Sequence, residues 1–192
     1  ELEVKGRLPF VSRGGVKLAH ALDQFQINVS GLTALDVGAS TGGFTDCLLQ
    51  RGAKHVYAVD VGHGQIDYGL RQDDRVTIME KTNARHPFEL PEPVDLMTMD
   101  VSFISITMVI PEASRHLKPG DYIVSLVKPQ FEAPKDKVGR GGVIKDPTVH
   151  AGVLGKTVNW AVGQGLRVRD ICRSPIQGDA GNHEFFILLQ KP

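Results

Sequence analysis

The chain has 192 residues, of which 41% are hydrophobic, and this is enough to bury the core of one compact domain. Its 22 acidic and 22 basic residues cancel, so the net charge favours no polyanionic partner, although it is compatible with a local basic face. Two cysteines are too few for a disulfide scaffold, no apolar run could span a bilayer, and no histidines have metal-ligand spacing. We therefore expect a cytoplasmic protein with no metal site and no membrane contact.

Residues 1–12 are mixed in composition and predict a linker or N-terminal arm, followed by one domain over residues 13–192. Apolar residues then recur at helical spacing from Gly15 to about Asn28, with Ser12 as a candidate cap. Beyond this helix, apolar runs alternate with helical segments, which is typical of parallel strands joined by crossover helices. The expected strands are residues 32–37, 54–60, 76–79, 94–99, 122–127, 165–174 and 183–190. The further expected helices are residues 42–51, 64–71, 105–117 and 147–163, the last one capped by Asp146.

The end of the chain departs from this alternation. No helical segment separates the last two expected strands, so they must pair antiparallel or lie apart. The sequence therefore predicts an α/β fold with a doubly wound, mostly parallel sheet of seven strands and an antiparallel C-terminal strand. Residues 129–146 are expected to form a long loop that contains the run Gly139-Arg-Gly-Gly, and loops of this length are usually functional or disordered.

A glycine-rich turn joins the first expected strand to the next helix, in the segment Leu35-Asp-Val-Gly-Ala-Ser-Thr-Gly-Gly-Phe44. Glycine allows a ligand to approach the backbone closely, because no Cβ atom stands in the way. Asp60 ends the second expected strand, where a carboxylate can accept hydrogen bonds from both hydroxyls of a ribose. Either feature alone is common, but together they predict a nucleoside-cofactor site. The spacing of the glycines resembles the loop of S-adenosylmethionine (SAM) methyltransferases rather than that of most NAD sites.

Polar residues at the ends of the other strands complete the candidate site, because ligands of open α/β sheets bind beyond the carboxyl ends. Asn83 follows the third expected strand, Asp100 ends the fourth and Lys128 ends the fifth. A lysine there could simply reach solvent, but the position of Lys128 one strand from Asp100 favours a functional role. Asp100 is not followed by the Pro-Pro pair that methyltransferases of nucleobase amines often carry. The Asp–Lys couple therefore favours a hydroxyl acceptor, whose pKa the lysine lowers or whose proton it takes.

A series of motifs in one order covers nearly the whole chain. They are Ser12-Arg-Gly-Gly-Val-Lys17-Leu, Asp36-Val-Gly-Ala-Ser-Thr-Gly-Gly-Phe-Thr, Asp60-Val-Gly-His-Gly-Gln, Asp100-Val-Ser-Phe-Ile-Ser, Val127-Lys-Pro-Gln-Phe-Glu132, Gly141-Gly-Val-Ile-Lys-Asp146-Pro, Ser174-Pro-Ile-Gln-Gly and Gly181-Asn-His-Glu184-Phe. In these motifs the chain resembles the TlyA/hemolysin-A family of FtsJ-like ribosomal RNA 2′-O-methyltransferases. The resemblance implies a Rossmann-like SAM-dependent methyltransferase fold, S-adenosylmethionine as the cofactor and methyl transfer to a ribose hydroxyl.

The resemblance also implies roles for individual residues. It implies a catalytic tetrad of the order Lys-Asp-Lys-Glu, which falls on Lys17, Asp100, Lys128 and Glu184. From the residues alone, Lys17 would be interpreted as a solvated helix residue and Glu184 as a charge on an edge strand. The predicted cofactor-binding residues are Asp36, Gly38, Ser40, Gly42, Gly43, Phe44, Asp60, Val61, Asn83 and Asp100.

The expected partner is ribosomal RNA within a ribosomal subunit. Members of the family usually carry an N-terminal S4 RNA-binding domain that this sequence lacks, so we expect the full-length protein to contain one. RNA contacts of the chain itself would fall to basic residues near the site, and we expect weak affinity. The predicted RNA-binding residues are Arg13, Lys135, Lys137, Arg140 and Lys145. For the last four of these, a solvated surface loop is the alternative.

Three other functions stay open at this point. A small-molecule O-methyltransferase would need an apolar lid over the site and no basic flanks. A membrane-lytic hemolysin would need a signal peptide, a spanning segment or a basic amphipathic helix, and the sequence shows none of these. A module that binds SAM without catalysis is disfavoured because Asp100 and Lys128 are both present. The sequence predicts neither the modified nucleotide nor the oligomeric state.

Overall fold

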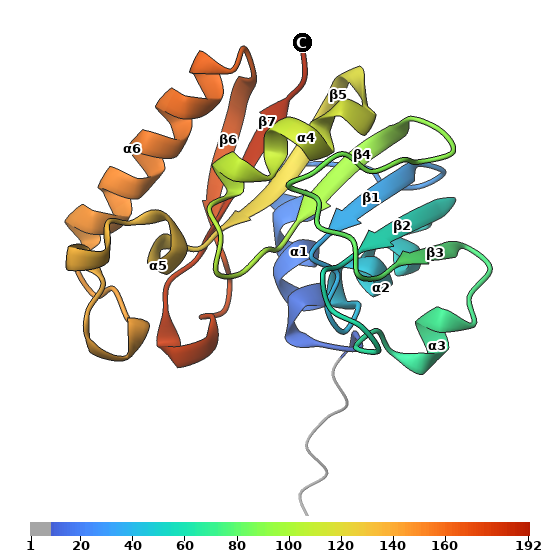
Figure 1. Cartoon of the computed structure of the whole chain (residues 1–192), viewed down its shortest axis with the longest axis horizontal. Coiled ribbons are helices and arrows are strands. Elements are labelled where there is room, and N and C mark those ends of the chain that lie inside the picture. The colour runs from blue at the N-terminus through green and yellow to red at the C-terminus, as the bar shows by residue number, and fades with distance from the viewer. Residues whose placement is uncertain (1–8) are drawn as a thin grey trace, which may run out of the picture.

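The computed structural model describes residues 9–192, and these residues form one seven-stranded sheet with helices packed on both faces (Figure 1). The strand order is β3-β2-β1-β4-β5-β7-β6. Neighbouring strands from β3 to β5 pair in parallel, whereas β7 pairs antiparallel with both β5 and β6. The predicted fold class, a doubly wound and mostly parallel sheet with an antiparallel C-terminal strand, is therefore confirmed.

All seven strands form within the expected segments or extend them. They are β1 (Thr33–Val37), β2 (His55–Val59), β3 (Val76–Met79), β4 (Val94–Met99), β5 (Leu117–Val127), β6 (Arg167–Arg173) and β7 (Phe185–Gln190). Every residue of β1 is buried, as expected for a central strand that is covered on both faces.

The helices cover the two faces of the sheet. They are α1 (Arg13–Gln24), α2 (Gly43–Gln50), α3 (Tyr68–Arg71), α4 (Ile110–Ala113), α5 (Pro129–Glu132) and α6 (Pro147–Gly163). Leu18 of α1 and Leu48 of α2 belong to the core on one face, and Ile110 of α4 and Val153 of α6 belong to the core on the other. The predicted cap of α6 is confirmed, because the carboxylate of Asp146 accepts a hydrogen bond from the backbone N–H of Thr148.

The predicted helix over residues 105–117 is wrong. A 3-10 turn at Ile106–Met108, the single turn of α4 and another 3-10 turn at Ser114–His116 replace it. The buried Leu117 already pairs with Val94 of β4, so the chain is part of the sheet at a point where the sequence pattern still favoured a helix. Consequently Lys118-Pro119-Gly120 lies in the first part of β5 and does not end a helix.

Two other helices are shorter than predicted. α1 ends at Gln24 rather than near Asn28, and Gln26 has a positive φ of 54° that continues no helix. The expected helix over residues 64–71 contains only α3, because Gly64 has a φ of 71° and lies in a bend instead. The expected loop over residues 129–146 begins with α5 and contains 3-10 turns at Lys135–Lys137 and Arg140–Gly142.

Residues 9–12 of the predicted arm lie against α2, and the rest of that arm lies outside the described residues. The backbone N–H of Val11 donates to Asp46 Oδ2 at 2.8 Å, and Gln50 Nε2 donates to the carbonyl oxygen of Pro9 at 3.0 Å. The chain therefore enters α1 along a fixed path on the helix that follows the glycine-rich turn.

The direction of β7 determines which residues share the functional edge of the sheet. Parallel strands bring their carboxyl ends to this edge, but an antiparallel strand brings its beginning. Val127 at the end of β5 pairs with Phe185 at the start of β7. The residues just outside this pair, Lys128 and Glu184, are therefore neighbours at the same edge of the sheet.

Candidate active site

Two cavities lie beyond the carboxyl ends of the parallel strands. The first has a volume of about 260 Å³ and is lined by the start of α1, the glycine-rich turn and residues near the start of β7. The second has a volume of about 460 Å³ and is lined by the ends of β1 and β2 and by residues that follow β3 and β4. Gly38, Ser40, Asp100 and Ser102 line both cavities, so the two cavities meet at the ends of β1 and β4.

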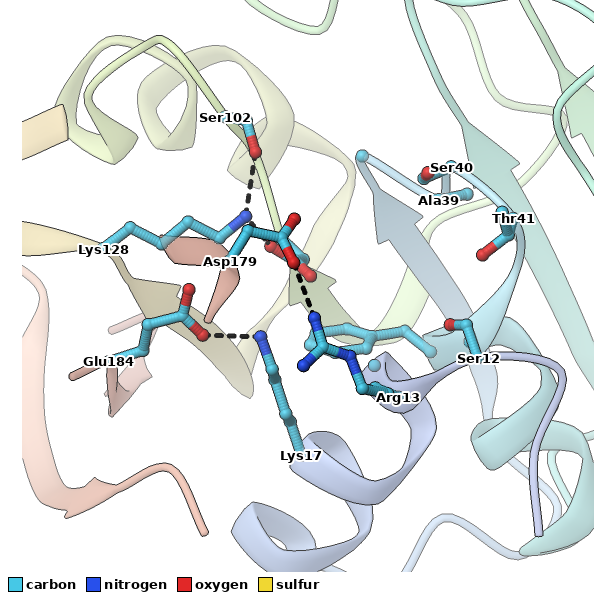
Figure 2. A pocket seen from close by; sticks show the side chains of 15 residues that line it. Ser12, Arg13, Lys17, Ala39, Ser40, Thr41, Ser102, Lys128, Asp179 and Glu184 are labelled. Carbon is cyan, nitrogen blue, oxygen red and sulfur yellow. Dashed lines mark hydrogen bonds and ion pairs between the residues drawn. The ribbon is translucent and has the colours of Figure 1, made fainter. Parts of the chain in front are cut away.

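A buried ion pair forms one wall of the first cavity. Lys17 Nζ of α1 lies 2.6 Å from Glu184 Oε2, and their side chains are only 9% and 2% exposed (Figure 2). Neither residue is solvated, and β7 lies between β5 and β6, so Glu184 is no edge-strand charge. A Cβ atom on Gly178 would lie 2.0 Å from Glu184 Oε1, so only glycine at this position leaves room for the carboxylate.

A second ion pair lies at the junction of the two cavities. Lys128 Nζ is 2.5 Å from Asp100 Oδ1 and donates a hydrogen bond of 2.9 Å to Ser102 Oγ. Figure 2 shows the side chains of Lys128, Glu184 and Lys17 directed into one space from the end of β5, the start of β7 and the first turns of α1. The structure thus brings together all four residues of the predicted tetrad.

The glycine-rich turn lies beside both cavities at the end of β1. Gly38 has a φ of 83°, and a Cβ atom there would lie 2.3 Å from the backbone oxygen of Asp100. Gly43 and Phe44 line the first cavity. Gly42 lines neither cavity, since its α-carbon faces Leu70 of α3, which a Cβ atom would approach to 2.2 Å. The role of Gly42 in this structure is close packing between α2 and α3.

The second cavity offers polar groups suited to a nucleoside. Asp60 Oδ2 accepts a hydrogen bond from the backbone N–H of Ser40 at 2.8 Å, and Oδ1 accepts one from that of Gly62 at 2.6 Å. A carboxylate has further lone pairs, so the same oxygens can accept bonds from a ribose diol. Val61 and Asn83 line the same cavity. The size of this cavity and its hydrogen-bonding groups fit S-adenosylmethionine.

Asp36 was predicted to contact the cofactor, but the structure places its side chain elsewhere. It is 0% exposed and lines neither cavity. Its carboxylate accepts hydrogen bonds from Thr45 Oγ1 at 2.7 Å and from Thr98 Oγ1 at 3.0 Å. Burial raises the pKa of Asp36 to about 7, although these two hydrogen bonds act in the opposite direction. Asp36 therefore links β1 to α2 and β4 beneath the glycine-rich turn.

The raised pKa makes the stability of the protein depend on pH. An aspartate in the unfolded chain ionises near pH 4, whereas Asp36 in the folded chain stays protonated up to about pH 7. The folded state binds the extra proton within this window, so stability should fall as pH rises, by about 1.4 kcal/mol per pH unit, and level off above it. In Asp36→Asn this part of the slope should vanish. Urea unfolding of both proteins at a series of pH values measures how the free energy of unfolding depends on pH. Identical pH dependence in the two proteins would contradict the raised pKa of Asp36.

The predicted RNA-binding residues fall into two groups. Arg13, the first residue of α1, lines the first cavity, and its Nη2 lies 2.6 Å from Asp179 Oδ1 (Figure 2). The other four, which line neither cavity, are exposed in and beside the 3-10 turns that follow α5: Lys135, Lys137, Arg140 and Lys145.

Among the cavity-lining residues that sequence reasoning did not select, three stand out by their contacts or conformation. Ser102 bonds Lys128, Asp179 pairs with Arg13, and Phe103 is 91% exposed with a positive φ of 62°. Phe103 also lies 4.9 Å from the ring of Phe131, measured between centroids. The position of Ser102 and Phe103 shortly after the strand-end Asp100 was a usable signal, whereas nothing local marks Asp179.

Within residues 9–192 no helix is both long enough and apolar enough to cross a membrane. In the same part of the chain, no three histidine, cysteine or acidic side chains are grouped so that they could hold a metal ion.

The fold and the two cavities are those expected of a SAM-dependent methyltransferase. At the level of the fold, a SAM-dependent methyltransferase from Mesorhizobium loti is similar, with a TM-score of 0.66 and 16% identity over 90% of this chain and 96% of that one. The profile of the FtsJ-like methyltransferases matches residues 10–191, and the chain belongs to this family.

Two other proteins are much more similar in sequence. The 16S/23S rRNA (cytidine-2′-O)-methyltransferase TlyA of Mycobacterium tuberculosis is 46% identical over 183 residues, which cover 94% of this chain and 68% of TlyA. A solved structure from Lactococcus lactis, which carries the name of a hemolysin, is 44% identical with a TM-score of 0.92, over 97% of this chain and 90% of that one. Both the cofactor and the family expected from the sequence are thereby confirmed.

Proposed function

We propose that the protein transfers a methyl group from S-adenosylmethionine to a ribose 2′-hydroxyl of ribosomal RNA. The observation that carries this proposal is the Lys128–Asp100 pair at the junction of the two cavities, next to the buried Lys17–Glu184 pair. A cavity with this set of charged groups offers an acceptor hydroxyl both a proton acceptor and a source of positive charge. The relative named TlyA acts on rRNA at a cytidine 2′-oxygen, which agrees with this chemistry.

The roles of the residues follow from their positions. When bound, S-adenosylmethionine supplies an electrophilic methyl group and leaves as a neutral thioether. Asp60 and Asn83 would hold its nucleoside part in the second cavity, with the methionine part near Gly38 and Ser40, which line both cavities, and the start of α2, which lines the first. In its neutral form Lys128 can take the proton of the acceptor hydroxyl, and as an ammonium it stabilises the negative charge that develops on the oxygen.

The Lys17–Glu184 pair has a different proposed role. Its two charges are almost completely desolvated and compensate each other, so an acceptor nucleotide meets a fixed and polar wall rather than water. The free oxygen of Glu184 and the remaining N–H groups of Lys17 can bond ribose hydroxyls. We propose that this pair orients the ribose while Lys128 acts on the reacting oxygen.

RNA binding would combine the cavity with basic groups around it. Arg13 lies in the wall of the first cavity, and we propose that it and the four exposed cations after α5 contact phosphates. We further propose that an N-terminal S4 domain accompanies this domain in the full-length protein and supplies most of the affinity. In support, the chain spans only 68% of the length of TlyA.

The experiment that tests the function uses methyl-labelled SAM and purified ribosomal subunits. Label on a ribose 2′-oxygen makes the adjacent phosphodiester resistant to alkali, so hydrolysis should release a labelled dinucleotide. Label that appears on a free base or a mononucleotide would overturn the ribose assignment. If only small hydroxylated molecules are labelled, the enzyme is a small-molecule O-methyltransferase instead.

A further inference from the structure

Ser102 lies between the two cavities and touches the side chain that the proposed reaction needs most. It lines both cavities, and its hydroxyl accepts a hydrogen bond from Lys128 Nζ at 2.9 Å. We propose that Ser102 is a positioning residue for methyl transfer, which acts by fixing the direction of the Lys128 amine. This proposal rests on the proposed function of the same site.

The geometry around Lys128 shows why a second partner matters. Asp100 Oδ1 is 2.5 Å from Nζ, yet this oxygen accepts no hydrogen bond of normal geometry within the described part of the chain. The contact therefore supplies charge attraction but little direction, because hydrogen bonds weaken steeply at poor angles. The bond to Ser102 Oγ does satisfy hydrogen-bond geometry. Ser102 thus sets the rotation of the amine (Figure 2), and Asp100 keeps the amine in place by charge attraction.

The loop that carries Ser102 is itself held against the segment of Lys128. Glu132, at the end of α5, accepts hydrogen bonds from Ser105 Oγ at 2.6 Å and from the backbone N–H of Ile106 at 2.8 Å. Between Ser102 and these two bonds the backbone passes through the positive φ of Phe103, a conformation that persists only where its surroundings hold it. The position of Ser102 relative to Lys128 is therefore fixed from both ends of the loop.

This arrangement has a chemical consequence for the acceptor. An ammonium has three N–H groups, and the bond of one of them to Ser102 restrains the directions of the other two, so that one can serve the acceptor hydroxyl. During transfer the acceptor oxygen gains the methyl carbon, the electron pair of the S–C bond goes to sulfur, and the hydroxyl proton leaves the oxygen. In the neutral amine, the same bond to Ser102 restrains the direction of the lone pair that takes this proton. Without Ser102 the amine can rotate away from the acceptor.

The test compares three variants in the labelled-SAM assay with ribosomal subunits. Ser102→Ala should lower kcat about tenfold to a hundredfold, which is the effect expected from the loss of one hydrogen bond to a charged group. The KM for the subunit and the Kd for SAM should stay within about threefold of those of the unmodified protein, because Ser102 acts on the chemical step. Ser102→Thr keeps the hydroxyl and should restore most of kcat.

Ser30→Ala is the matched control, since it removes an exposed serine that precedes β1, at the opposite end of the sheet from Lys128. It should leave both kcat and the melting temperature nearly unchanged. The proposal is overturned if Ser102→Ala retains full kcat, or if Ser30→Ala loses as much kcat as Ser102→Ala does.

A second measurement needs no RNA and so separates this inference from the proposed function. Trace labelling of lysines with acetic anhydride, read by mass spectrometry, reports how freely each amine reacts. Lys128 should react several times faster in Ser102→Ala than in Ser30→Ala, since its hydrogen-bond acceptor is gone. Equal rates would contradict the role of Ser102 even if ribosomal RNA proved not to be the substrate. Absence of RNA labelling by the unmodified protein, with faster acetylation in Ser102→Ala, would refute only the proposed function.

Discussion

Lys128→Ala is expected to reduce methyl transfer by about a thousandfold, within the range that general acid–base groups contribute. Lys128 Nζ is the amine at the junction of the cavities, and the other tetrad lysine, Lys17, is engaged by Glu184. Single-turnover transfer from labelled SAM to ribosomal subunits measures the loss, and calorimetry should find SAM affinity nearly unchanged.

Lys118 provides the control for this variant, because it lies near the opposite end of the same strand and pairs with Asp95. Lys118→Ala should retain full transfer. Concurrent loss of transfer and SAM binding in Lys128→Ala would assign a structural role to Lys128. A melting temperature far below that of the unmodified protein would point to the same conclusion.

Asp60→Ala should have its main effect on cofactor affinity. The carboxylate joins the backbone N–H groups of Ser40 and Gly62 and can accept bonds from the ribose, so its removal disturbs both the ligand and the wall that holds it. We expect SAM affinity to fall about a hundredfold, corresponding to roughly 3 kcal/mol, with a smaller loss of kcat at saturating SAM.

Asp74, an exposed residue in the connection between α3 and β3, provides the comparison. Asp74→Ala should bind SAM as the unmodified protein does. Calorimetric titration with SAM gives the dissociation constants of the unmodified protein, Asp60→Ala and Asp74→Ala for comparison. An unchanged dissociation constant for Asp60→Ala would remove this residue from the ribose site.

The strands and the strand-end residues were predictable because they depend on short-range patterns. Apolar runs of five or six residues mark buried strands. Ligands of open α/β sheets bind beyond the carboxyl ends of the strands, and this rule places Asp60, Asp100 and Lys128 at one edge. The same rule was wrong about the side chain of Asp36. This residue lies within β1, one position before its last residue, and its side chain points to Thr45 and Thr98 instead of the ligand.

Lys17 and Glu184 could not be identified from local pattern. The sequence around Lys17 is that of an ordinary helix, and only the packing of α1 near the sheet edge buries this side chain. Glu184 precedes its strand, whereas the other strand-end residues of the site follow theirs. Only the antiparallel direction of β7 brings Glu184 to the edge, next to Lys128. The resemblance to the methyltransferase family therefore carried information that periodicity and spacing did not. The failed helix over residues 105–117 has a comparable cause, since pairing of Leu117 with β4 overrides local helix preference.

The buried pair between Lys17 and Glu184 joins residues that are 167 positions apart in the sequence. A ribosome that is still translating this domain releases the lysine early and the glutamate almost last. No growing polypeptide can therefore possess a complete reaction centre before nearly all of the domain has emerged and β7 has inserted between its neighbours. Premature termination anywhere upstream of β7 would produce an inert fragment rather than an enzyme with reduced turnover.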